Sequence, residues 1–275
     1  MVTPTPLDLD RILPLVRKPG QYVGGELHAV SGRMDADSLN FCLVFPDLYE
    51  IGMSHQGLQI LYHILNGQDH VAAHRAYAPD KDMEQELRAQ GQPLFSLEAK
   101  VALSAYDVLG ITLPYELCYT NILTVLDLGG LPLRAAARNE QHPLVLGGGS
   151  CSLNPEPVAD FFDAVVLGDG EEIIIEIANL LLQAKVEQWN RSLTLERLAD
   201  IAGVYVPAFF RPHYQQGRLT SIEPLRPEYP WVRKRVLPQL SAAPYLHHPL
   251  VPVVSPVHDR LGVEIARGCT RGCRF

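Results

Sequence analysis

The feature that most constrains the fold is an alternation of short apolar runs with helical patterns along residues 39–190. The first run, Leu39–Phe45, is almost unbroken, which is typical of a parallel strand covered on both faces. From Leu58 to Leu65, apolar residues then recur at helical spacing. A strand, a loop and a helix therefore follow one another, and the unit repeats along the chain.

Four further strands are predicted by the same pattern, at Val71–Tyr77, Asp107–Leu113, Pro143–Leu146 and Asp163–Leu167. The helices that accompany them are expected at Asp80–Gln90, Glu116–Leu128, Pro157–Phe162 and Ile173–Gln188. Five strands that alternate with helices predict an α/β fold, a Rossmann-like (flavodoxin-like) doubly wound parallel five-stranded sheet. In such sheets ligands bind beyond the carboxyl ends of the strands.

The same pattern divides the chain into four parts. Residues 1–38 are expected to form an N-terminal arm, and residues 39–190 the Rossmann-like domain. Residues 191–258 are expected to form a small α+β cap with a proline-rich linker, and residues 259–275 are expected to be the start of a further domain. Outside the main domain, the expected elements are a helix at Leu7–Arg17, a helix at Leu195–Ala202, a hairpin of Val204–Phe210 with Arg218–Glu223, and a strand at Gly262–Ala266.

The composition is that of an ordinary globular protein, with 47% hydrophobic and 20% charged residues in a chain of 275. The formal net charge of -8 argues against nucleic-acid binding, because domains with that function are generally basic. No apolar run is long enough to cross a bilayer, and Met1–Pro14 does not resemble a leader peptide. The five cysteines are odd in number and are not spaced like disulfide partners, so a reducing cytoplasm is expected.

Two cysteines near the end of the sequence form a candidate metal site. Cys269 and Cys273 are separated by three residues and follow the last expected strand. A loop after a strand can present two thiolates to one metal, and thiolates suit iron–sulfur clusters. Cys42, Cys118 and Cys151 instead lie among apolar or small residues and are expected to be buried.

Three loops at strand ends form a candidate ligand site. Asp47–Gly57 follows the first strand, Gly147–Asn154 the fourth, and Gly168–Glu171 the fifth. Glycine lets the backbone approach a ligand closely, and the amides at the start of a helix attract polar or anionic groups. We expect these loops to meet at one edge of the sheet.

The cysteine pair and the first loop resemble motifs of known families. The spacing of Cys269 and Cys273 resembles the first two cysteines of the radical S-adenosylmethionine (radical SAM) motif CxxxCxxC, with Phe275 at the aromatic position before the third. The loop Asp47–Gly52 is similar to the D-x-H-x-x-G loop of cobalamin-binding domains, with Tyr49 in place of the histidine.

The later loops strengthen the resemblance. Cobalamin-domain radical SAM proteins commonly carry G-G-x after the fourth strand, then P-E, then G-E-G-E after the fifth. This chain has Gly147–Ser150, Pro155-Glu156 and Gly168–Glu171, with Asp169 in place of the first glutamate of the last motif. The chain thus resembles the uncharacterised proteins in which a cobalamin-binding-like domain precedes a radical SAM domain.

The resemblance implies the cofactors and the residues that contact them. Cys269 and Cys273 would bind a 4Fe-4S cluster with a third cysteine. In the whole protein the cluster would cleave S-adenosylmethionine to a radical that acts on the substrate, with methyl transfer as one such reaction. Cobalamin would bind without a protein histidine on cobalt, since the phenol of Tyr49 is protonated at neutral pH. The residues implied to line the cofactor are Asp47, Tyr49, Gly52, Ser54, Thr112, Pro114, Gly147, Gly148, Gly149, Ser150, Gly168, Asp169, Gly170 and Glu171.

The chain is accordingly expected to be an N-terminal fragment that ends inside the cysteine motif and is inactive alone, with the remainder of the radical SAM domain as its partner. Two other functions remain open: a cofactor-free domain that docks a partner or positions a substrate, and a flavodoxin-like module that binds flavin or a nucleotide. His55 is a possible substitute cobalt ligand, although a hydrogen bond at the helix end is its expected role. No G-x-S-x-G, H-E-x-x-H or Walker sequence points to a hydrolase.

Overall fold

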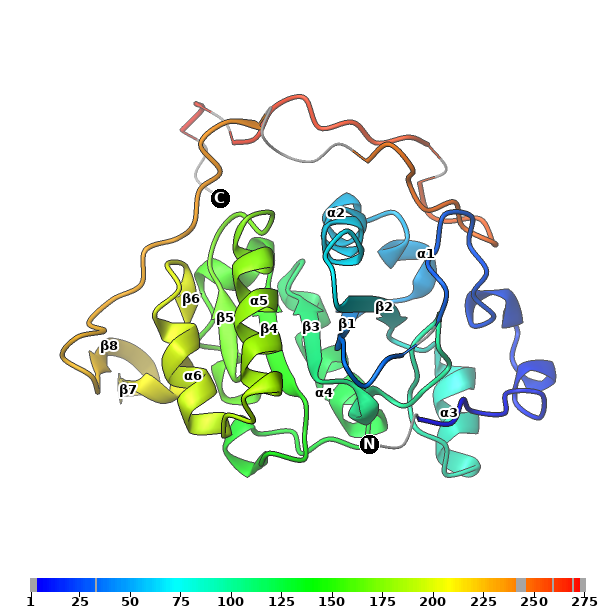
Figure 1. Ribbon diagram of the computed structural model, residues 1–275, viewed down its shortest axis with the longest axis horizontal. Helices are drawn as coiled ribbons and strands as arrows, with labels where there is room; N and C mark the ends of the chain where they lie inside the picture. The colour runs from blue at the N-terminus through cyan, green and yellow to red at the C-terminus, as the bar shows by residue number, and fades with distance from the viewer. Residues whose placement is uncertain (1–3, 33, 241–245, 259, 269, 273–275) are drawn as a thin grey trace.

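The computed structural model describes residues 4–32, 34–240, 246–258, 260–268 and 270–272. Its centre is a six-stranded sheet in the order β2-β1-β3-β4-β5-β6 (Figure 1). The first five strands are parallel, and β6 is antiparallel to β5. The strands are β1 (Leu39–Phe45), β2 (Val71–Tyr77), β3 (Val108–Thr112), β4 (Leu144–Gly148), β5 (Ala164–Val166) and β6 (Val204–Tyr205). The predicted α/β fold with five parallel strands is confirmed, and β6 adds a short sixth strand.

Helices cover both faces of the sheet, and alternate residues of β1 show which helices share a face. Phe41 packs in one core with α2 and α5, whereas Cys42 packs in the other core with α3 and α4. This follows from the alternation of side chains along a strand. The helices are α1 (Tyr49–Gly52), α2 (Gln56–Asn66), α3 (Lys81–Ala89), α4 (Tyr119–Leu128), α5 (Ile173–Val186) and α6 (Arg191–Ala199). None of the helices in the described ranges has both the length and the apolar character needed to cross a membrane.

Three predicted helices are wrong in extent. The helix expected at Leu195–Ala202 is α6, which begins four residues earlier and ends three residues earlier. The expected helix Leu7–Arg17 contains only a 3-10 turn at Leu13–Leu15, because Pro14 would remove a donor from the helix interior and collide with the preceding turn. The expected helix Pro157–Phe162 is reduced to a 3-10 turn at Ala159–Phe161.

The second strand of the hairpin lies where it was predicted, from Arg218 onward, but the first strand lies further along the chain than predicted. The hairpin pairs β7 (Phe210–Gln215) with β8 (Arg218–Pro224), while Val204–Tyr205 joins the main sheet instead. Pro207 begins a 3-10 turn that separates the two strands, since proline cannot donate to a ladder. The strand expected at Gly262–Ala266 is absent: residues 260–268 are irregular.

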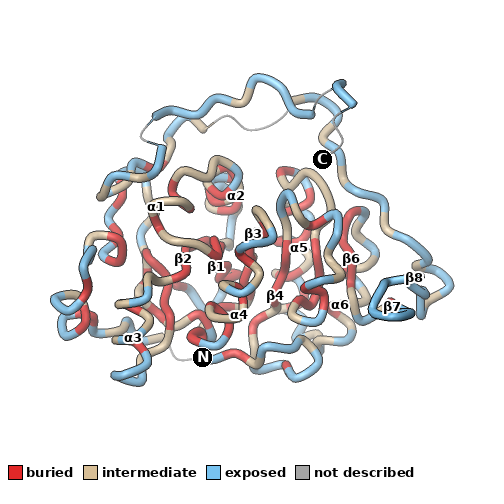
Figure 2. Tube along the Cα trace, turned by 180° about the vertical axis from the view of Figure 1, so that it is seen from behind, coloured by how far each residue is buried: buried red, intermediate tan, exposed pale blue. Residues whose placement is uncertain are grey.

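The described residues beyond β8 form no further α-helix or strand, and they run across the end of the sheet where the parallel strands finish (Figure 1). Most of this segment is exposed, in contrast with the buried central strands (Figure 2). We call residues 246–258 and 260–268 of this segment the strap. Isolated contacts hold the strap to the domain, among them a bridge between Leu27 and Val251.

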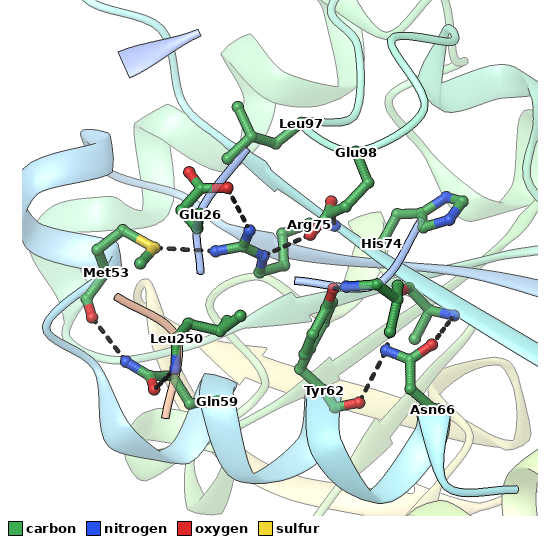
Figure 3. Close-up of polar contacts among 12 residues, drawn as sticks. Glu26, Met53, Gln59, Tyr62, Asn66, His74, Arg75, Leu97, Glu98 and Leu250 are labelled. Atoms are coloured by element: carbon green, nitrogen blue, oxygen red, sulfur yellow. Dashed lines mark hydrogen bonds and ion pairs between the residues drawn. The ribbon is translucent and has the colours of Figure 1, made fainter. Parts of the chain in front are cut away.

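The N-terminal arm is attached to the domain by a buried ion cluster (Figure 3). Arg75 of β2 donates from Nη2 to Glu26 at 2.9 Å and from Nε to Glu98 at 2.6 Å. The side chain of Arg75 is 0% exposed, and those of Glu26 and Glu98 are 0% and 2% exposed. Because a buried charge without a partner is strongly unfavourable, the cluster fixes the arm against β2.

Candidate functional site

A cavity of about 800 Å³ lies where the parallel strands finish. Its floor comes from β1, β3, β4 and β5, and α2 and α5 form two of its walls. The crevice at this end of a doubly wound sheet is where ligands bind in such folds. The volume lies in the range of cofactor and small-molecule sites.

The floor of the cavity is open because two positions that face it from the strands are glycine, Gly110 and Gly148, whereas a Cβ on Gly147 would point to the opposite core, toward Phe162. Gly110 lies within β3, and Gly147 and Gly148 end β4. A Cβ at Gly110 would lie 2.6 Å from the Phe41 ring, whereas a Cβ at Gly148 would meet its nearest atom, on Val166, at 3.6 Å. Position 148 therefore has room for a side chain at its base, and a large one there would fill the cavity.

The turn after β4 requires glycine. Gly149 has φ of 120°, and a Cβ there would lie 3.0 Å from the carbonyl oxygen of Leu113. Cys151 donates its amide to the same oxygen at 3.0 Å. The β4 loop is thereby held against the end of β3, which brings Ser150 and Thr112 to the cavity.

The walls are apolar and the mouth is charged. Leu58 and Leu61 of α2 face Ile173 and Ile174 of α5 across the cavity. Around the mouth lie the acidic residues Asp169, Glu171 and Glu264 and the basic residues Lys234, Arg235 and Arg267. The site thus suits a ligand with a large apolar body and a polar or charged periphery.

The loop between β5 and α5 binds an arginine that precedes the cysteine pair. Arg267 donates to both carboxylate oxygens of Glu171, at 2.6 and 3.3 Å, and lies 3.1 Å from Asp169. It also contacts Glu264 at 2.8 Å. The hydrogen bonds that Arg267 donates to Glu264 and Glu171 raise the pKa of Arg267, and the bond from Arg267 lowers the pKa of Glu264.

Tyr49, which stands where cobalamin-binding loops have their histidine, does not line the cavity. Its side chain is buried, donates to Glu26 at 2.9 Å and accepts from the amide of Val253 at 3.2 Å. Burial, the larger effect, and the negative charge of Glu26 both raise the pKa of Tyr49, so the phenol remains protonated. A neutral phenol with both hydrogen-bonding roles filled does not ligate a metal.

The other residues of the first loop also point elsewhere. Asp47 accepts hydrogen bonds from the Tyr115 hydroxyl and the Leu48 amide. Ser54 donates to Glu50 at 3.2 Å and accepts from the amide of His258 at 3.1 Å. A Cβ on Gly52 would lie 2.4 Å from the Tyr77 ring, so this glycine serves close packing.

The structure therefore divides the predicted cofactor residues into two groups. One group lines the cavity: Thr112, Gly147, Gly148, Gly149, Ser150, Gly168, Asp169, Gly170 and Glu171. The other group does not line it: Asp47, Tyr49, Gly52, Ser54 and Pro114.

The predicted cluster ligands, Cys269 and Cys273, lie outside the described residues, and the metal site stays a prediction. Among the described residues, no three histidine, cysteine or acidic side chains are placed to hold a metal ion. Cys42 and Cys118 are buried and Cys151 is partly so. Burial is the main cause that raises the pKa of each of these three thiols, which makes them poor nucleophiles.

His55 lines the cavity but is occupied as a helix cap. Its Nδ1 accepts a hydrogen bond from the Leu58 amide at 3.1 Å at the start of α2, as expected from the sequence. Burial lowers the pKa of its imidazole. The neutral tautomer with an unprotonated Nδ1 carries its proton on Nε2, so the ring offers a donor and has no free lone pair for cobalt.

The titration of His55 leads to a pH prediction. The unfolded imidazole has a pKa near 6.5, and the folded pKa is lower, so the unfolded chain binds more protons as the pH falls through about 6.5 and stability declines. His55→Asn keeps a good N-cap without titrating. From about pH 7.5 to about pH 5.5, urea unfolding should show a smaller loss of stability in this variant than in the wild type. Equal losses of stability in the two proteins would contradict the inference that His55 has a lower pKa in the folded state than in the unfolded chain.

Two parts of the site were missed by sequence reasoning. Gly110 carried a readable signal, because glycine inside a strand pattern often marks a close approach to another group. Residues 234–237 line the mouth of the cavity, and their sequence carried no signal of this role. A β-bridge between Gly168 and Arg235 holds residues 234–237 at the mouth of the cavity. In this bridge the amide of Arg235 donates to the carbonyl oxygen of Leu167 at 2.7 Å.

Comparisons with known proteins bear on this architecture. The family described as radical SAM proteins, N-terminal, matches residues 57–207. The uncharacterized protein MJ0966 of Methanocaldococcus jannaschii is 22% identical over 245 residues, which cover 86% of this chain and 40% of that protein. The chain thus spans less than half the length of this curated relative.

One solved structure is also similar, the radical S-adenosylmethionine methyltransferase TsrM from Kitasatospora setae with its tryptophan substrate and a SAM analog bound. It is 18% identical, with a TM-score of 0.39 over 64% of this chain and 29% of that chain. The family match extends over more than half of the chain, from the start of α2 to the end of the six-stranded sheet. The chain therefore belongs to the radical SAM proteins, in the N-terminal region of that family.

Proposed function

We propose that the cavity binds a corrinoid cofactor for a radical SAM protein, without a protein histidine on cobalt. The observation that carries the proposal is the cavity itself, which opens over Gly110 within β3 and Gly148 at the carboxyl end of β4. The order of its loops matches that of cobalamin-domain proteins, and the family match supports a radical SAM setting.

The residues at the cavity fit part of such a cofactor. The apolar walls of α2 and α5 suit an aromatic or aliphatic group, and the glycine floor admits it close to the backbone. A whole corrinoid is larger than a drug-sized ligand, so a portion would enter the cavity and the rest would extend past the mouth. Lys234, an exposed cation on the cavity lining, would meet an anionic group there.

The remaining roles rest on the longer protein. Cys269 and Cys273, together with a third cysteine, would bind a 4Fe-4S cluster for S-adenosylmethionine, and the rest of the radical SAM domain would be the partner of this chain. When bound, the corrinoid supplies a carrier for a methyl group. The contribution of this chain is to bind the cofactor, to shield its apolar part from water and to leave cobalt without a protein nitrogen ligand.

Titration with hydroxocobalamin tests the proposal. We expect saturable one-to-one binding in the visible spectrum, without histidine-ligated cobalt because no histidine is available. A base-off spectrum would indicate that the cofactor's own benzimidazole is also removed from cobalt. Gly148→Trp should abolish it, since the backbone tolerates a Cβ at this position and the indole would occupy the cavity. Leu117→Trp is the matched control, because that side chain is 85% exposed and lies outside the cavity lining.

Each outcome selects one function. Binding that both tryptophan variants retain would place the corrinoid elsewhere and overturn the proposal. No corrinoid binding, together with saturable flavin binding that Gly148→Trp removes, would favour the flavodoxin-like alternative. Binding of neither ligand would favour a cofactor-free domain that docks a partner or positions a substrate.

A further inference from the structure

Arg267 connects the strap to the loop between β5 and α5. Its guanidinium faces three carboxylates: Glu171 at 2.6 Å, Glu264 at 2.8 Å and Asp169 at 3.1 Å. Two of these belong to the loop and the third to the strap itself. The guanidinium contacts both oxygens of Glu171, which is the directional and stronger form of this interaction.

The burial of Glu171 makes the contact more than a surface ion pair. Its side chain is 7% exposed, while that of Arg267 is 31% exposed. A carboxylate that has lost most of its water needs a partner, and among the described residues Arg267 is the only cation paired with it. Asp169 is held as well, since it accepts from the amide of Leu237 at 2.7 Å. The loop is therefore an organised acceptor for one arginine.

The opposite end of the strap is held across the mouth, beside α1 and α2. Val253 donates to the Tyr49 hydroxyl, and His258 donates to the Ser54 hydroxyl. Gln56 of α2 donates to the carbonyl of Gly262 at 3.2 Å. The strap thus passes from α1 and α2 to the start of α5 (Figure 1), and Glu264, Arg267 and Gly268 form part of the cavity lining.

We propose that Glu171 and Asp169 are positioning residues that dock Arg267, and with it the segment that leads directly into the cysteine pair, at the mouth of the cavity. The acidic loop then serves to hold the chain rather than to contact a cofactor. Tyr49 and Ser54 have the same role at the other side of the mouth. This docking of Arg267 does not rest on the proposed function.

Limited trypsin digestion of the unliganded chain tests the docking directly. Trypsin must engage the Arg267 side chain to cut after it, so cleavage there follows the population of undocked strap. Arg260 is exposed on the same strap, and cleavage after it is the internal reference. The measured quantity is the ratio of initial cleavage rates at the two sites, read by mass spectrometry.

Glu171→Gln should raise this ratio about tenfold, the effect expected when a charge-assisted, partly buried contact is lost. Glu172→Gln is the matched control, because Glu172 is the next residue but pairs with Arg235; it should leave the ratio within about twofold. Should Glu171→Gln not fold, Glu264→Gln removes a more exposed carboxylate and should raise the ratio about threefold.

A conservative change separates docking from general loosening of the fold. Arg267→Lys keeps the charge and the trypsin site but lacks the planar fork, so its ratio should lie between those of the wild type and Glu171→Gln. In the double variant, Glu171→Gln should add little to Arg267→Lys, since both act on one contact. Fully additive effects, or a ratio unchanged by Glu171→Gln, would overturn the proposal even if corrinoid binding were demonstrated. Failure to bind corrinoid would leave the digestion result unaffected.

Discussion

Replacing Arg75 by methionine is expected to lower the free energy of unfolding by about 3–5 kcal/mol. Arg75 is the cation between Glu26 and Glu98, and all three side chains are at most 2% exposed. Methionine fills much of the same volume but leaves two buried carboxylates without a cation, each with one neutral hydrogen-bond donor, Tyr49 for Glu26 and the amide of residue 75 for Glu98. The N-terminal arm, which contributes Glu26, should then detach from β2 (Figure 3).

Urea unfolding measures the effect, and Arg88→Met provides the comparison. Arg88 also pairs with two acidic residues, Glu84 and Asp127, but its side chain is 47% exposed. Surface pairs of this kind contribute about 0–1 kcal/mol. A similar small loss for both variants would show that the Arg75 cluster does not stabilise the fold in the way its burial indicates.

Gly168→Ala should lower stability by about 3 kcal/mol and disrupt the mouth of the cavity. Gly168 has φ of 101°, and a Cβ there would lie 2.0 Å from the carbonyl oxygen of Arg235. That oxygen accepts the Asp169 amide at 3.1 Å, so the bridge that holds residues 234–237 in the wall would break. Because Asp169 and Glu171 belong to the same loop, the docking of Arg267 should weaken too.

Gly217→Ala separates the two causes of this loss. Gly217 also has positive φ, 75°, but no atom lies within 4 Å of its Cβ position. It should therefore lose only about 1 kcal/mol, the cost of positive φ for a residue with a side chain. Equal losses in urea unfolding would assign the whole effect to backbone conformation and would remove the argument for a close approach to Arg235.

The main elements were predictable because they depend on local pattern. The run Leu39–Phe45 is apolar at every position but one, and it forms β1 with both faces covered. The predicted helix at the end of the domain, Ile173–Gln188, differs from α5 by two residues. Errors occur where a proline interrupts the pattern, at Pro14 and Pro207, and where a strand lacks a neighbour, at Gly262–Ala266.

The candidate site was predictable only in part. Gly147–Ser150 and Gly168–Glu171 reach the cavity because the ends of parallel strands meet at one edge. Asp47 and Tyr49 were equally well placed by motif, yet their side chains contact Tyr115 and Glu26 instead. Their orientation depends on which polar partners the fold brings near, and no local pattern records that.

By itself, then, the sequence determined the order of strands and helices, the glycines that open the cavity floor and the resemblance that led to the radical SAM family. Only the tertiary structure decided which loops face the cavity and that Arg267 lies against Glu171, 96 residues earlier in the chain. The physical reason is the distance along the chain between the residues that determine each feature. Secondary structure follows from spacing within a few residues, whereas a buried ion pair forms between distant residues that share no period and meet only once the whole sheet has folded.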